Sequence, residues 1–258
     1  MLRHGFADWG LLLALTVLWG SAFLLTKVAV GTFPPDLVVA GRLAIASLLL
    51  VPLALVFARR LPMSSRLWLF LVLIGLFGSA LPFSLISWGQ KFIDSGVAGI
   101  LMAVMPLATL SLSHFLVPGE RLTSYRIAGF VLGFVGVIIL MGPEAMVQLV
   151  NGSGQLVPML AVLGGAFCYA IAAILARLRP PSDALASASA TTLLATFMIV
   201  PFVLLDPGLD DAALAPPPHA VAALVVLGVF STALAAILYF RLIKSAGPAF
   251  VSQLNYLI

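Results

Sequence analysis

The chain has 258 residues, of which 62% are hydrophobic and only 9% are charged. A soluble globular domain has about 25% charged residues, so this composition excludes an ordinary soluble enzyme and a disordered chain, and it predicts a membrane-embedded protein. The formal net charge of +4 fits either a nucleic-acid surface or basic loops that orient membrane helices, and only the positions of the basic residues separate the two.

A helix that crosses the hydrocarbon core of a bilayer needs about 20 mainly apolar residues. Long stretches without Asp, Glu, Lys or Arg therefore predict the membrane spans. Nine such stretches follow one another: 9–26, 43–58, 67–90, 95–119, 127–143, 145–176, 184–205, 212–240 and 245–258. The second is long enough only if its helix begins near Leu37, and that start places Arg42 inside the membrane. The sequence thus predicts an all-α polytopic membrane protein.

The positions of the basic residues predict the orientation of these spans. If the N-terminus lies in the cytoplasm, ten of the 13 lysines and arginines fall at cytoplasmic ends of spans. The opposite connection at 206–219 contains three aspartates and no lysine or arginine. Membrane topology therefore explains the positive charge, and we expect no nucleic-acid partner. The expected partners are the lipid bilayer and a small-molecule substrate.

Four short segments of the first half have similar segments about 150 residues later. The pairs are 18–20 with 168–170, 51–52 with 200–201, 75–81 with 228–234, and 96–98 with 247–249. The first copy, residues 8–142, holds five predicted helices. Because five is odd, the second copy, residues 155–258, starts from the opposite side of the membrane. The sequence therefore predicts two inverted five-helix repeats.

The repeat also predicts how much of the second copy is present. Ile258 matches about residue 107 of the first copy, which continues for about 35 residues more. We therefore expect the natural protein to have ten transmembrane helices, nine of them at least partly present here, with the second repeat truncated within its fourth helix.

Several local motifs match a known family. They are Trp19-Gly20 in the first predicted helix, Arg42-Leu43-Ala44 in the second, Ser95-Gly96-Val97-Ala98-Gly99 and Pro106 in the fourth, the turn Gly119-Glu120-Arg121-Leu122, and Gly129, Gly133 and Gly136 in the fifth. Together they resemble the EamA-type branch of the drug/metabolite transporter superfamily. The resemblance implies ten helices in two inverted halves and movement of amino acids, related metabolites or drugs, commonly outward across a bacterial inner membrane. His114 departs from it, because an aliphatic residue is more usual there.

In inverted-repeat transporters the substrate site lies near the bilayer midplane, between the halves and beside interrupted helices. The third and fourth predicted helices carry prolines and polar groups at that depth, and Ala98, Met102, Met105 and Thr109 form one stripe. The predicted substrate-binding residues are Trp19, Arg42, Ser79, Ser84, Trp88, Met102, Met105, Thr109, Tyr169, Tyr239, Gln253, Asn255 and Tyr256. For each of these residues the alternative interpretation is ordinary helix packing. A further alternative is an interfacial aromatic belt for Trp88 and Tyr239. For Gln253, Asn255 and Tyr256 it is the boundary of the span.

Ionisable side chains inside lipid are costly and indicate function. Arg42 lies about 9 Å inside its predicted helix, and its counterpart in the repeat is Thr191. Its guanidinium either holds a substrate carboxylate or extends to the outer face to pair with Asp36 or Asp94. Lys27 has the same two interpretations, substrate binding or extension to the outer face. His114 is either a protonation or gating site or an interface histidine.

These features predict a secondary transporter for small amphipathic metabolites, amino acids first, that works by alternating access as an uncoupled exporter or facilitator. No Asp or Glu falls in a span core, and no phosphate-binding loop occurs. We expect no enzyme activity, no cofactor and no metal. The alternatives are a proton-coupled carrier for drugs or other metabolites and a channel. Gly129 and Gly133 have the spacing of a helix-packing pair, and we expect a monomer or a weak homodimer.

Overall fold

The computed structural model describes residues 5–58, 64–117, 123–136 apart from 126 and 130, 139, 147, 155–205 and 216–257. These residues are mainly helical, and no strand occurs among them. Seven of the described helices are long and apolar enough to cross a membrane: Phe6–Val30, Pro35–Phe57, Ser65–Gly89, Ser95–Leu116, Leu156–Leu178, Ala184–Leu205 and Pro218–Ala246. The fold is that of an all-α polytopic membrane protein, as the composition predicts.

Four of these spans are single helices: α1 (Phe6–Val30), α2 (Pro35–Phe57), α8 (Leu156–Leu178) and α9 (Ala184–Leu205). α2 starts with Pro35 in its first turn, where the missing amide hydrogen costs no helical bond. This start lies close to the expected one near Leu37. Arg42 is therefore inside the span, about two turns from its beginning.

Two other spans change to a wider π-helix near their middle. The first runs through α3 (Ser65–Gly75), η1 (Leu76–Ala80) and α4 (Leu81–Gly89), and the second through α10 (Pro218–Val226), η3 (Leu227–Leu234) and α11 (Ala235–Ala246). Pro82 follows the first π segment and cannot donate an amide bond back into it. Both π segments fall on the two stretches, 75–81 and 228–234, that resemble each other in sequence. Such π segments often occur at functional sites.

The fourth predicted span is also interrupted. α5 (Ser95–Met102) ends one turn before α6 (Met105–Leu116), with Pro106 in the first turn of α6. Near the end of the chain, Gly247 adopts φ 82°, a left-handed conformation that favours glycine, and two short helices follow, α12 (Pro248–Ser252) and α13 (Leu254–Leu257). α11 extends to Ala246. The boundary between the last two predicted stretches therefore lies later in the chain than the sequence predicts.

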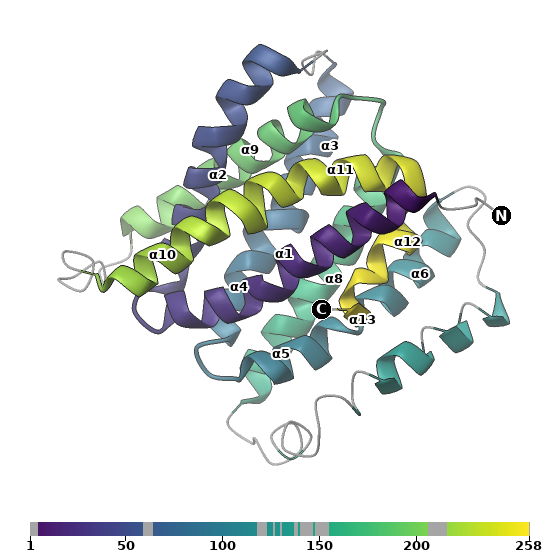
Figure 1. Cartoon of the computed structure of the whole chain (residues 1–258), viewed down its shortest axis with the longest axis horizontal. Coiled ribbons are helices and arrows are strands. Elements are labelled where there is room, and N and C mark those ends of the chain that lie inside the picture. Colours follow the sequence, from purple (N-terminus) through teal and green to yellow (C-terminus); the bar gives the residue numbers. More distant parts are fainter. Residues whose placement is uncertain are drawn as a thin grey trace.

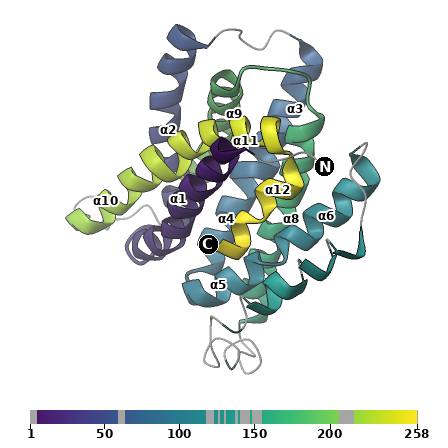
Figure 2. The same cartoon turned by 45° about the vertical axis from the view of Figure 1, so that its right-hand side comes forward.

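Helices from the two ends of the chain pack side by side. α2 lies along α9, and α1 lies along α10 and α11, in both views of the molecule (Figures 1 and 2). α8 packs against α4 and α6. Large apolar side chains such as Leu48, Phe57 and Leu205 are exposed on the outer surface, where a bilayer would cover them. Of the expected stretch 127–143, the structure describes an apolar helical part at Ile127–Gly136; most of the remainder lies outside the described residues.

Candidate functional site

A cavity of about 140 Å³ lies between the helices at the level of the two π segments. Aromatic side chains form much of its wall: Trp19, Phe23, Phe83, Tyr169, Tyr239 and Phe240. Its polar groups are Thr26, Arg42, Ser79, Ser87, Gln90, Thr191, Thr192, Ser231 and Thr232. The cavity therefore has the mixed apolar and polar lining of a site for a small amphipathic molecule.

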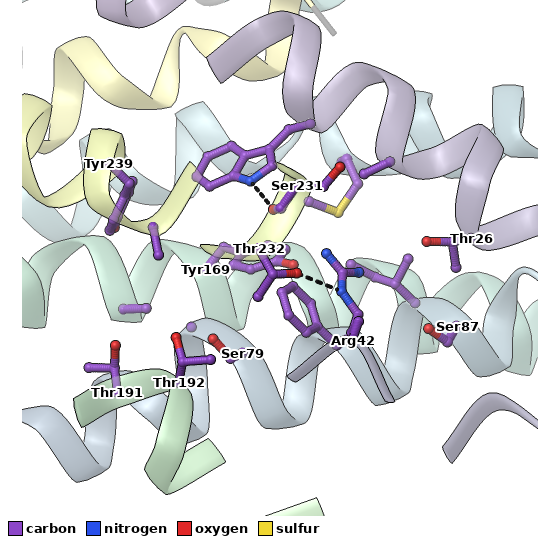
Figure 3. A pocket seen from close by; sticks show the side chains of 18 of the residues that line it. Thr26, Arg42, Ser79, Ser87, Tyr169, Thr191, Thr192, Ser231, Thr232 and Tyr239 are labelled. Carbon is purple, nitrogen blue, oxygen red and sulfur yellow. Dashed lines mark hydrogen bonds between the residues drawn. The ribbon is translucent and has the colours of Figure 1, made fainter. Parts of the chain in front are cut away.

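Arg42 brings a positive charge into this cavity from α2. Its Nε donates to Thr232 Oγ1 at 3.1 Å, and its Cζ lies 3.9 Å from the centre of the Phe83 ring. Within the described part of the chain, its two terminal nitrogens have no hydrogen-bond partner, and it forms no ion pair with Asp36 or Asp94. Figure 3 shows the guanidinium projecting from α2 with Thr232 on one side. The geometry leaves the face that binds carboxylates open to the cavity.

Two pairs of aromatic rings join the first and second parts of the chain around the cavity. The Trp19 and Tyr239 rings lie 5.7 Å apart, and the Phe83 and Tyr169 rings meet edge to face at 6.4 Å. The Trp19 indole nitrogen also donates to the Ser231 carbonyl oxygen at 3.1 Å. These contacts fix the orientation of the rings, and they connect α1 with α11 and α4 with α8.

The π segments place hydroxyl groups at the cavity. Ser79 comes from η1, and Ser231 and Thr232 come from η3 (Figure 3). Thr232 Oγ1 donates to the Leu227 carbonyl oxygen at 2.8 Å while it accepts from Arg42. Ser231 Oγ and Gln90 Oε1 are buried without a hydrogen-bond partner among the described residues. A polar atom that is buried without a hydrogen bond is costly, so these two atoms add an energetic cost to the packing of the cavity wall.

A second arginine lies behind one wall of the cavity. Arg179, directly after α8, has its Cζ 5.0 Å from the centre of the Phe240 ring, and it donates to Ser182 Oγ. Burial lowers the pKa of its guanidinium from the ordinary value. Because Phe240 lines the cavity and Arg179 does not, this arginine supports the wall without adding its charge to the described lining.

Comparison with known proteins decides the family. Residues 8–142 and 156–258 each match the model of the EamA-like transporter family. The chain belongs to this family. It is therefore a multi-pass membrane protein of a transporter family.

Relatives of this EamA family member carry transporter names. The chain is 26% identical to the uncharacterized inner membrane transporter YedA of Escherichia coli over 249 residues, which cover 96% of this chain and 78% of YedA. It is 28% identical to the uncharacterized transporter YoaV of Bacillus subtilis over 172 residues, which cover 65% of this chain and 56% of YoaV. Its match to an uncharacterized transporter of Buchnera aphidicola, 30% identical, covers 40% of that protein. These last two matches span about half the length of the relatives.

The fold of this EamA family member also resembles a solved crystal structure. The two chains share 20% sequence identity with a TM-score of 0.67, and the match covers 94% of this chain and 84% of the other. At this identity the likeness supports the fold alone.

The structure brings about half of the predicted substrate-binding residues together. Seven of them line the cavity: Trp19, Arg42, Ser79, Met102, Met105, Tyr169 and Tyr239. Ser84 and Trp88 are not among the described lining residues, because they occupy a neighbouring face of the same helix. The cavity face contains Phe83, Ser87 and Gln90 at helical spacing.

The other predicted residues lie elsewhere. Thr109 is fully buried in α6, one turn after Met105 and outside the described lining. Gln253 also lies outside that lining, and Tyr256 packs against Gly133. The side chain of Asn255 lies outside the described residues.

The two residues predicted for proton or gating roles are also outside the described cavity lining. Lys27 Nζ donates to the carbonyl oxygens of Gln90 and Ile93 at 2.8 and 2.9 Å, so it ties α1 to the end of α4. His114 is exposed near the end of α6, with its ring 4.9 Å from that of Phe115.

Several polar lining residues are absent from the predicted substrate-binding set. They are Thr26, Ser87, Gln90, Thr191, Thr192, Ser231 and Thr232. The spacing of Ser79, Phe83, Ser87 and Gln90 is a signal for one helix face and identifies part of the set. Thr191 could be found as the repeat counterpart of Arg42. Thr232 could likewise be found as the repeat counterpart of Ser79, whereas Ser231 matches Gly78 and carries no such signal.

Proposed function

We propose that the protein is a secondary transporter for small amphipathic carboxylates, with amino acids as the first class to test. The observation that carries this proposal is the Arg42 guanidinium, whose terminal nitrogens are open to an aromatic-lined cavity in a transporter fold. A guanidinium binds a carboxylate through two parallel hydrogen bonds. The aromatic walls accept the apolar part of the same molecule.

The proposed mechanism is alternating access by two inverted halves, residues 8–142 and 155–258. Matched positions of the two halves support it, because Trp19 and Tyr169 both line the cavity, as do Arg42 and Thr191. Interrupted helices at corresponding positions are typical of such transporters. We place the protein in a bacterial inner membrane with its N-terminus in the cytoplasm, from the distribution of basic residues and the description of YedA.

The composition of the cavity favours an uncoupled facilitator or exporter that needs no cofactor. No Asp or Glu is among the described residues that line it, and proton-coupled carriers commonly use such a carboxylate. Proton-coupled efflux of drugs or other metabolites is the competing function, and it requires another proton carrier.

The experiment is uptake of radiolabelled amino acids into proteoliposomes, with and without an imposed pH gradient. We expect saturable uptake that does not depend on the gradient, that is lost in Arg42→Ala and that is retained in Arg66→Ala, which removes an exposed arginine of α3. Size-exclusion chromatography of each variant controls for folding. Uptake that occurs only with the gradient would overturn the uncoupled mechanism. Absence of saturable uptake for every amino acid would overturn amino acids as substrates.

A further inference from the structure

We propose that the cavity selects organic anions of net charge −1 over zwitterions of the same shape, and that transport is consequently electrogenic. The inference rests on the proposed function, since it concerns the substrate of the same cavity. It goes further by assigning the net charge of the substrate and the response of transport to membrane voltage.

The described lining of the cavity carries a positive formal charge. Arg42 is the one side chain with a formal charge at neutral pH among the described residues that line it. Its polar neighbours are hydroxyls, phenols and the amide of Gln90, none of which carries a negative charge at that pH. The described lining therefore has a formal charge of about +1.

The positive charge of Arg42 is held by neutral groups. Arg42 is 5% exposed, and its described contacts are the neutral Thr232 hydroxyl and the face of the Phe83 ring. A hydroxyl and a ring orient the guanidinium without neutralising it. Buried charges in proteins are ordinarily paired, so the absence of a described counter-ion leaves that position for the substrate.

A monoanion and a zwitterion can carry the same carboxylate and differ in net charge. A monoanion neutralises Arg42 when the cavity closes around it. A zwitterion also brings an ammonium, and the acceptor atoms that the described lining offers it belong to neutral hydroxyl, phenol and amide groups. These atoms can bond to the ammonium, but a net charge of about +1 then stays buried in a low-dielectric site. The monoanion is therefore the better electrostatic match.

The net charge of the substrate sets the charge that one transport cycle moves across the membrane. A carrier that returns to its starting state has moved only the charge of its substrate. Each cycle with a monoanion therefore moves one negative charge across the membrane, whereas a cycle with a zwitterion moves none. Voltage should therefore drive net accumulation of the anion and not of the zwitterion.

The test uses three molecules with one phenylethyl skeleton in proteoliposomes at pH 7.4, about physiological pH. They are 3-phenylpropionate, phenylalanine and phenethylamine, which are an anion, a zwitterion and a cation. Valinomycin with a potassium gradient sets the membrane voltage, and protein-free liposomes give the background flux. We expect kcat/KM for 3-phenylpropionate to exceed that for phenylalanine by about tenfold or more, a difference of about 1.4 kcal/mol. We also expect an inside-positive voltage to increase net accumulation of the anion, and no saturable flux of the cation.

Two variants separate the charge of Arg42 from its shape. Arg42→Lys keeps the charge as a single donor group and should keep the preference for the anion at lower affinity. Arg42→Gln removes the charge and should abolish the preference, while Arg66→Ala should behave as the wild type. If Arg42→Gln does not fold, the wild-type comparison of anion with zwitterion still decides the matter.

The outcomes distinguish this inference from the proposed function. Phenylalanine flux that equals or exceeds 3-phenylpropionate flux, without a response to voltage, would overturn anion selection and leave carboxylate transport standing. Saturable flux of phenethylamine alone would overturn both proposals.

Discussion

Gly228 lies where η3 makes a close contact with α2, and its replacement by alanine tests that packing. A Cβ at this position would lie 2.6 Å from both Cβ and Cγ2 of Ile45 and 3.2 Å from the Arg42 carbonyl oxygen. Carbon atoms in contact lie about 3.5–4.0 Å apart, so η3 and α2 would have to separate by about 1 Å. The β-branched Ile45 side chain cannot rotate its Cβ away. Overpacking of this kind costs about 1–3 kcal/mol, and we expect the free energy of unfolding to fall by that amount.

Gly164→Ala is the matched control for this substitution. A Cβ on Gly164 in α8 would lie 3.6 Å from Leu85 Cδ1, an ordinary contact, so its stability should stay equal or rise by about 0.5–1 kcal/mol. Thermal unfolding of both variants in one detergent measures the difference, and uptake measures its effect on the site. Transport should fall in Gly228→Ala, because the displaced backbone carries Arg42. Equal stability and equal transport in the two variants would refute the packing argument.

Three further substitutions test single contacts. Thr232→Val removes the hydroxyl oxygen that accepts from Arg42 Nε at 3.1 Å. A hydrogen bond to a charged group contributes about 1.5–3 kcal/mol, so substrate affinity should fall about tenfold or more. Thr232→Ser keeps the hydroxyl and should retain the affinity. Lys27→Met should lower the melting temperature because two carbonyl oxygens at the end of α4 lose their donor, whereas exposed Lys91→Met should not. Trp19→Phe keeps a ring and loses the 3.1 Å indole bond to η3, so the free energy of unfolding should fall by about 1 kcal/mol.

The sequence predicts the membrane fold and the depth of Arg42 because both depend on local composition. An apolar stretch long enough to span must start before residue 43, and the structure starts α2 at Pro35. That start places Arg42 within the helix. The position of its guanidinium depends on contacts with Phe83 and Thr232, which are distant in sequence. Composition therefore leaves the cavity and the outer face as alternatives.

Which polar residues line the cavity is harder to predict, because it depends on helix phase. Ser84 and Trp88 share a depth with Ser87 but occupy another face. The π segments add a second difficulty, since each shifts the phase of the residues that follow. Ser231 and Thr232 reach the cavity through such a segment. Helix periodicity alone misses both, and only the repeat match of Thr232 to Ser79 indicates one of them.

The central claim is that Arg42 holds the carboxylate of the substrate, and a double-mutant cycle tests it most directly. The affinity of a carboxylate and of its primary amide would be measured for wild type and for Arg42→Gln, with purified protein in detergent. We predict that the amide binds wild type more weakly by about 1.5–3 kcal/mol and binds Arg42→Gln no more weakly than the carboxylate does. An equal loss on amidation in both proteins would contradict the claim and place the carboxylate elsewhere.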